Sequence, residues 1–149
     1  MLSNPGVRMP KENLRRSSVS AARLRYLRVA LILVGLIFIF GIYPLMMSLW
    51  PSGWRWSPNQ LEYEQMILGV YATLGMFLLI ASRNPLRHLS LIWFTVFSSI
   101  VHAGIMTVQA LRMPMEHGHL YGDIPALLIV AAVLGLLTPW GGENAQASS

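Results

Sequence analysis

His102 is the one side chain titrating near neutral pH within the long apolar segments of this chain. Burying such a group in a membrane is costly, so it is a candidate functional residue. Neutral imidazole can ligate the metal of haem or chlorophyll, and His102 could therefore hold a pigment or haem at a subunit interface. Alternatively, it could hydrogen-bond Ser98, Ser99 or a facing helix and serve packing, with no cofactor. We favour packing. A two-histidine haem site within the bilayer is excluded for a single chain, since these segments contain no second histidine.

Polar residues recur around His102 at steps of three and four, which place most of them on one helix face. This stripe should face other helices and not lipid, and it could line a cavity for an apolar ligand. It consists of Thr95, Ser98, Ser99, His102, Met106 and Gln109.

A second candidate is the loop with Glu116, His117 and His119, because imidazole and carboxylate groups can together bind zinc or another divalent ion. A capping or lipid-interface role is the alternative. Asp123, just beyond this loop, is a plausible N-cap for the apolar segment that follows it.

The sequence contains little that suggests catalysis. Glu62 and Glu64 are two positions apart and cannot both face one side of a helix, which disfavours an acid–base pair. There is no cysteine, and no phosphate-binding loop, nucleophile elbow or metalloprotease motif occurs. We therefore expect no enzymatic activity.

The composition identifies the elements that must position these residues. Of 149 residues, 54% are hydrophobic and only 11% are charged, against roughly 25% in soluble domains. A span needs about 20 apolar residues, and segments that are apolar all round are not soluble bundle helices. The sequence predicts an all-α bundle of four transmembrane helices, at about 30–50, 65–82, 89–111 and 124–139.

Charge predicts the topology. Seven Lys and Arg residues precede the first span and two more lie between the second and third, while only Arg55 and Arg112 lie on the other side. Basic loops stay cytoplasmic, so both termini should be inside. Residues 1–26 form a basic arm suited to anionic lipids and not to nucleic acid, 27–140 form the membrane domain, and 141–149 form a polar tail.

Small residues mark positions where helices could approach one another closely. They stand three apart in the second span and four apart in the fourth, at Gly69, Ala72, Gly75, Ala131 and Gly135.

Several strings together resemble a family of small four-span bacterial membrane proteins of unknown function, over roughly 27–139. The resemblance implies a four-helix bundle in the bacterial cytoplasmic membrane, and it implies no activity or cofactor. The strings are PSGWRW (51–56), YEQMILGVYATLG (63–75), HLSLIWFTVFSSIVHAG (88–104) and GHLYGDIPALL (118–128).

Three functional hypotheses follow, of which the third, a membrane enzyme of quinone or lipid chemistry with His102 as base, would need a partner acid that no carboxylate is deep enough to supply. The first is a non-catalytic accessory subunit that packs beside other integral membrane subunits, with a photosynthetic reaction centre or respiratory complex as the favoured host. The second is a binder or transporter of a lipid, quinone or other apolar molecule, which uses the polar stripe around His102.

Overall fold

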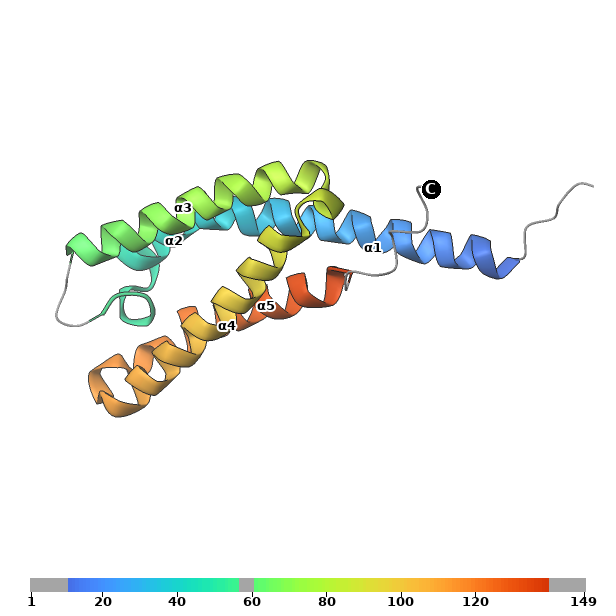
Figure 1. Cartoon of the computed structure of the whole chain (residues 1–149). Helices are drawn as coiled ribbons and strands as arrows, with labels where there is room; N and C mark the ends of the chain where they lie inside the picture. The colour runs from blue at the N-terminus through green and yellow to red at the C-terminus, as the bar shows by residue number, and fades with distance from the viewer. Residues whose placement is uncertain (1–10, 57–60, 140–149) are drawn as a thin grey trace, which may run out of the picture.

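The computed structural model describes residues 11–56 and 61–139, and the side chains of residues 21–56 and 61–139. The described residues contain helices and no strand (Figure 1). Four of these helices are long and apolar enough to cross a membrane: Ala21–Leu49, Leu61–Arg83, Leu89–Arg112 and Pro114–Leu137. The predicted all-α fold with four membrane-spanning helices is therefore confirmed, and the protein is a multi-pass membrane protein. The predicted tail and the first ten residues of the arm lie outside the described residues.

The first span is one continuous helical path made of several segments. It begins as α1 (Lys11–Leu36), which starts well before the predicted span, and continues through η1 (Ile37–Gly41), α2 (Ile42–Pro44) and η2 (Leu45–Leu49). Both η1 and η2 are π-helical. Pro44, the last residue of α2, has no backbone N–H to donate. The helix continues through this residue with a wider π-helical turn on either side of α2.

Three more spans follow the first. A short 3₁₀ turn, η3 (Pro51–Gly53), precedes α3 (Leu61–Arg83), and η4 (Pro85–Arg87) leads to α4 (Leu89–Arg112). The 3₁₀ helix η5 (Pro114–Leu120) then joins α4 to α5 (Asp123–Leu137). The fourth span is therefore interrupted between η5 and α5, and its α-helical part is the shortest of the four.

Two helical hairpins make up the bundle (Figure 1). α1 packs along α3, and α4 packs along α5, whereas α3 and α4 contact each other weakly although η4 joins them. The hairpins meet near η4 and the end of α5, and they diverge towards the start of α3 and η5 (Figure 1). η3 packs against η5 between the diverging ends.

Close backbone approach holds the first hairpin together. A Cβ atom built on Gly75 would lie 2.7 Å from the carbonyl oxygen of Gly35, and one built on Gly35 would lie 2.9 Å from that of Gly75. The predicted packing role of Gly75 therefore has a structural basis, with Gly35 as a partner that the sequence analysis did not single out. A Cβ atom built on Gly135 would lie 3.6 Å from the Val96 side chain, and Ala131 is buried, whereas a Cβ atom built on Gly69 would meet nothing within 4 Å. Ala72 is half-buried.

Arg23 fastens α1 to the end of α5. Its guanidinium donates hydrogen bonds to the carbonyl oxygens of Leu136, Leu137 and Thr138, at 2.9–3.0 Å. The last carbonyl groups of a helix lack partners within the helix and attract positive charge. Arg23, near the start of the first span, thus caps the C-terminus of the last span.

Candidate functional site

A cavity of about 550 Å³ lies between the two hairpins where they diverge. All four spans contribute to its wall, and Trp54 and Trp56 from the segment after η3 complete it. Tyr63 and Ile67 on α3 and Ile105 on α4 line the cavity and are also exposed. The cavity therefore opens between α3 and α4, on the flank where these helices separate.

Helical spacing places one face of α3 and one face of α4 on the cavity. Glu64, Ile67 and Tyr71 follow one another at steps of three and four along α3. His102, Met106 and Gln109 do the same along α4. Residues at these spacings share a face, so the lining follows directly from the two helices.

Tyr71 and His102 join the two hairpins across the cavity. The Tyr71 hydroxyl oxygen lies 2.8 Å from Nδ1 of His102, and the two rings stack with centroids 6.0 Å apart. This is the bond to a facing helix that the packing hypothesis predicted. Nε2 of His102 makes no hydrogen bond within the part of the chain that the structure describes. His102 thus holds the hairpins together and also offers a polar atom to the cavity.

Tyr71→Phe is expected to lower the free energy of unfolding by about 0.6–1.5 kcal/mol, because it removes one hydrogen bond between helices in a membrane. The measurement is SDS-driven unfolding in mixed micelles, followed by tryptophan fluorescence. Tyr63→Phe is the matched control, since the Tyr63 side chain is exposed and shows no hydrogen bond in the described structure. Equal stability of the two variants would contradict a stabilising role for the Tyr71–His102 bond.

The predicted polar stripe divides into two parts. Thr95 and Ser98 donate hydrogen bonds to carbonyl oxygens of α4 itself, at 2.9 Å to Leu91 and 3.2 Å to Thr95 respectively. Thr95 and Ser99 are buried among the helices. His102, Met106 and Gln109 line the cavity. Thr95 and Ser99 therefore face other helices, as expected, whereas His102, Met106 and Gln109 face the cavity.

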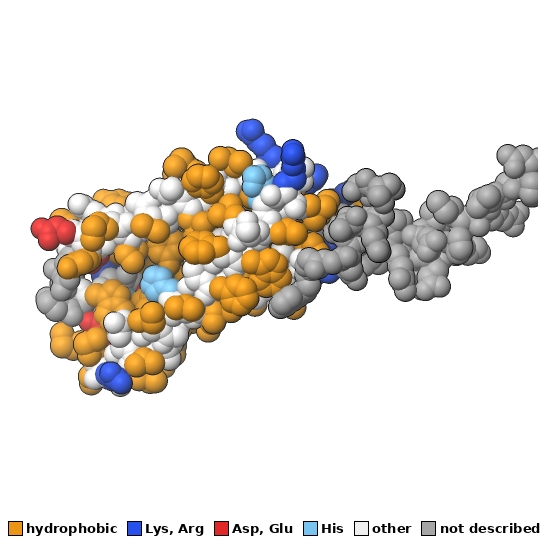
Figure 2. All heavy atoms as spheres, viewed as in Figure 1, with side chains coloured by type: hydrophobic (Ala, Val, Ile, Leu, Met, Phe, Trp, Pro, Cys, Tyr) orange, Lys and Arg blue, Asp and Glu red, His pale blue; other side chains and the backbone are white. Residues whose placement is uncertain are grey.

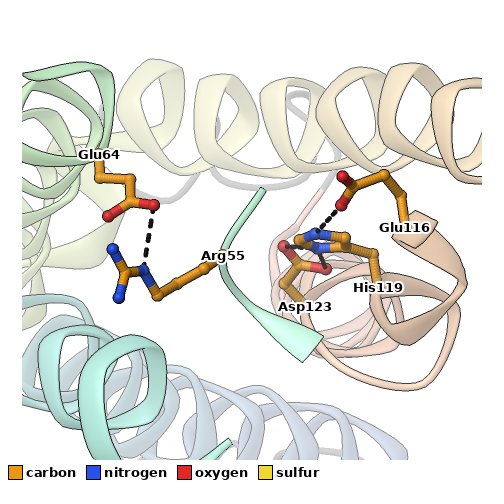
Figure 3. Close-up of polar contacts among 5 residues, drawn as sticks. All are labelled: Arg55, Glu64, Glu116, His119 and Asp123. Carbon is orange, nitrogen blue, oxygen red and sulfur yellow. Dashed lines mark hydrogen bonds and ion pairs between the residues drawn. The ribbon is translucent and has the colours of Figure 1, made fainter. Parts of the chain in front are cut away.

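Glu64 lines the cavity and forms an ion pair with Arg55, which is not itself a lining residue (Figure 3). Nε of Arg55 donates a hydrogen bond to Oε1 of Glu64 at 3.2 Å. Glu64 is only 6% exposed, and its other oxygen, Oε2, has no hydrogen-bond partner in the described structure. Nε1 of Trp54 is likewise buried without a partner. Glu62 is exposed, in agreement with the prediction that the two glutamates face different sides.

A second buried ionic cluster lies beside the cavity, on η5 and the first turn of α5 (Figure 3). Nδ1 of His119 lies 3.0 Å from both carboxylate oxygens of Asp123, and Nε2 lies 3.2 Å from Oε2 of Glu116. The second contact is within ion-pair distance but lacks hydrogen-bond geometry. Trp56 stacks on the imidazole with ring centroids 4.4 Å apart. The cluster ties η5, α5 and the segment after η3 to one another.

Two predictions about this loop need correction. Asp123 is not an N-cap, because it is the first residue of α5, Gly122 precedes it as the cap, and the Asp123 carboxylate is directed to His119. The metal triad Glu116, His117 and His119 does not converge, because the His117 side chain is exposed while the other two are buried. The described residues hold no group of three or more His, Cys, Asp or Glu side chains placed to bind a metal ion.

The sequence analysis did not predict that Tyr71, Trp54 and Trp56 line the cavity, nor that Glu64 is buried. One signal was present in the spacing, because Tyr71 is seven residues after Glu64 and hence on the same face of the helix. The arrangement of the two hairpins, which brings these residues opposite His102, has no such signal.

The surface of the described residues is that of a membrane protein. On the face shown in Figure 2, hydrophobic side chains are spread over the middle of the described part, and charged side chains gather towards its two ends. Phe40, Phe94 and Leu136 are more than 60% exposed, which is stable only against lipid or another apolar surface.

Comparison with known proteins identifies one family. No curated protein and no solved structure matches the chain. The model of a family of unknown function, DUF6632, matches residues 21–147, which include all four spans. The chain therefore belongs to the family of unknown function DUF6632.

Proposed function

We propose that this protein binds a small, mainly apolar molecule that enters the cavity between α3 and α4 from the bilayer. The observation that carries the proposal is the cavity itself. Its volume of about 550 Å³ lies in the range typical of small-molecule sites, and such sites combine apolar walls with a few polar groups. Tyr71 and His102 supply such polar groups midway along their spans, and Gln109 supplies another near the end of α4.

The mouth of the cavity supports entry from the lipid. Ile67 of α3 and Ile105 of α4 line the cavity and are exposed at its rim, at depths where a spanning helix contacts hydrocarbon. An apolar molecule dissolved in the bilayer therefore meets the opening without passing through water. The absence of Lys and Arg from the described lining residues makes a phosphate-bearing ligand a poor fit.

The proposal includes a location and an orientation in the membrane. Arg23 of α1, Arg83 of α3 and Arg87 of η4 belong to the end where the hairpins meet, and the positive-inside rule places this end in the cytoplasm. The cavity then lies in the outer half of the membrane, which for a bacterial host is the inner membrane. The accessory-subunit role, with a photosynthetic or respiratory partner, stays a prediction.

The test places a bulky side chain in the cavity. Ala126 lines it, so Ala126→Phe is expected to weaken ligand binding at least tenfold. Ala132 is exposed on the same helix, so Ala132→Phe is a matched control that should bind as the wild type does. The probe is N-phenyl-1-naphthylamine, and the readout is saturable energy transfer to it from tryptophan in lipid nanodiscs, since Trp54 and Trp56 line the cavity.

Both variants should first show wild-type helicity and elution as a single species. Saturable transfer that is lost in Ala126→Phe and retained in Ala132→Phe supports the proposal. Absence of saturable transfer in the wild type, or equal binding by the two variants, would overturn it.

A further inference from the structure

The charged groups that line the cavity are all acidic. Glu64 and Asp123 are lining residues, and no Lys or Arg side chain is among the lining residues of the described chain. Asp123 directs both carboxylate oxygens at His119, so its charge is already engaged. Glu64 is the carboxylate with an oxygen left for another group.

Glu64 has one satisfied and one unsatisfied oxygen. Arg55 donates to Oε1, whereas Oε2 is buried and has no hydrogen-bond partner in the described structure. An ionised carboxylate oxygen accepts hydrogen bonds, and leaving it buried without a donor is costly. A ligand that fits this end of the cavity must therefore bring a donor, and a positively charged donor gives the stronger bond.

Aromatic side chains line the same cavity. Trp54, Tyr63 and Tyr71 line the cavity together with Glu64. Aromatic faces attract cations, and the attraction is strongest where water is excluded. A cavity lined by a carboxylate and several aromatic rings therefore favours an organic cation. A neutral ligand could not offer a charged donor to Oε2.

We infer that the cavity selects an apolar amine in its protonated form, with the ammonium group on Glu64 Oε2 and the apolar body along Ile67 and Tyr71 towards His102. This inference rests on the proposed function and names the ligand class for the same cavity. Acceptor-only molecules such as quinones would leave Oε2 without a donor. A water molecule on Oε2 would supply the donor and remove the preference for an amine. Displacement by a charged and by an uncharged probe distinguishes these two cases.

The experiment compares two isosteric probes in nanodiscs of phosphatidylcholine, a lipid without net charge. 1-Naphthylmethylammonium and 1-naphthylmethanol share the same ring and differ in the charged donor. Each is titrated to displace N-phenyl-1-naphthylamine from the wild-type protein. The ammonium compound is expected to displace the probe at a concentration at least tenfold lower than the alcohol.

Variants locate the preference at one carboxylate. Glu64→Gln is expected to bring the two displacement concentrations within twofold of each other. Glu62→Gln removes an exposed charge two residues earlier on α3 and should keep the tenfold preference. Partition of the probes into lipid is the same for all three proteins, so it cancels in the comparison.

The outcomes separate this inference from the proposed function. Equal displacement by alcohol and ammonium in the wild type overturns the amine preference and leaves the cavity function standing. An ammonium preference that survives in Glu64→Gln overturns the role of Glu64. If N-phenyl-1-naphthylamine itself shows no saturable binding, the proposed function fails and the inference fails with it. If Glu64→Gln does not fold, the wild-type displacement concentrations, corrected for the partition of each compound into protein-free nanodiscs, still decide the ligand class.

Discussion

His119→Leu is expected to lower the free energy of unfolding by about 3–5 kcal/mol, the usual cost of removing one partner of a buried ionic group. His119 is fully buried between Glu116 and Asp123, which are 2% and 8% exposed. Leucine fills a similar volume but leaves the Asp123 carboxylate without its imidazole partner. The change also removes the stacking of Trp56 on the imidazole ring.

SDS titration in mixed micelles, followed by helicity, measures this loss. His117→Leu is the matched control, because His117 is two residues away on η5 and exposed, and it should change stability by less than about 0.5 kcal/mol. The double variant His119→Leu/Asp123→Asn should recover part of the loss, since it removes the uncompensated charge. Equal stability of His119→Leu and His117→Leu would show that the cluster does not stabilise the fold.

The number and approximate position of the spans could be predicted because hydropathy is a local property of the chain. Each predicted span overlaps a long apolar helix, with the main differences at the ends. α1 begins earlier than expected, because the basic segment before the span is itself helical and Arg23 caps α5. α5 begins at Asp123, within one residue of the predicted start of the fourth span at about 124, and the 3₁₀ helix η5 lies in the predicted loop before it.

The candidate site was predictable only on the helix that carries His102. The spacing along α4 correctly groups His102 with Gln109, but the partner of His102 depends on how the two hairpins diverge. Likewise, the period of a helix shows that Glu62 and Glu64 face different sides, and it does not show which of them faces inward. Contacts between distant helices depend on close approaches such as Gly35–Gly75, which a single sequence does not reveal.

Gly118→Ala is expected to lower the free energy of unfolding by about 3 kcal/mol, at the upper end of the usual cost of overpacking. A Cβ atom on Gly118 would collide with the backbone carbonyl oxygen of Ser52, and one on Gly122 would collide with that of Gly53. Both obstacles are backbone atoms, which cannot rotate away as a flexible side chain can. η3 would therefore have to separate from η5, where the two now pack together.

The substitution should also affect the cavity. Trp54 and Trp56 in the segment after η3 line the cavity, and Arg55 in the same segment pairs with Glu64. Gly118→Ala should therefore weaken the binding of N-phenyl-1-naphthylamine as well as lower the SDS concentration at which the protein unfolds. Gly69→Ala is the matched control, since a Cβ atom at Gly69 meets nothing within 4 Å, and it should leave both measurements unchanged. If Gly118→Ala unfolds at a lower SDS concentration and yet binds the probe as the wild type does, the contact between η3 and η5 stabilises the bundle without shaping the cavity. If both measurements change together, the same glycine contact that fastens the loop also positions the polar end of the binding site.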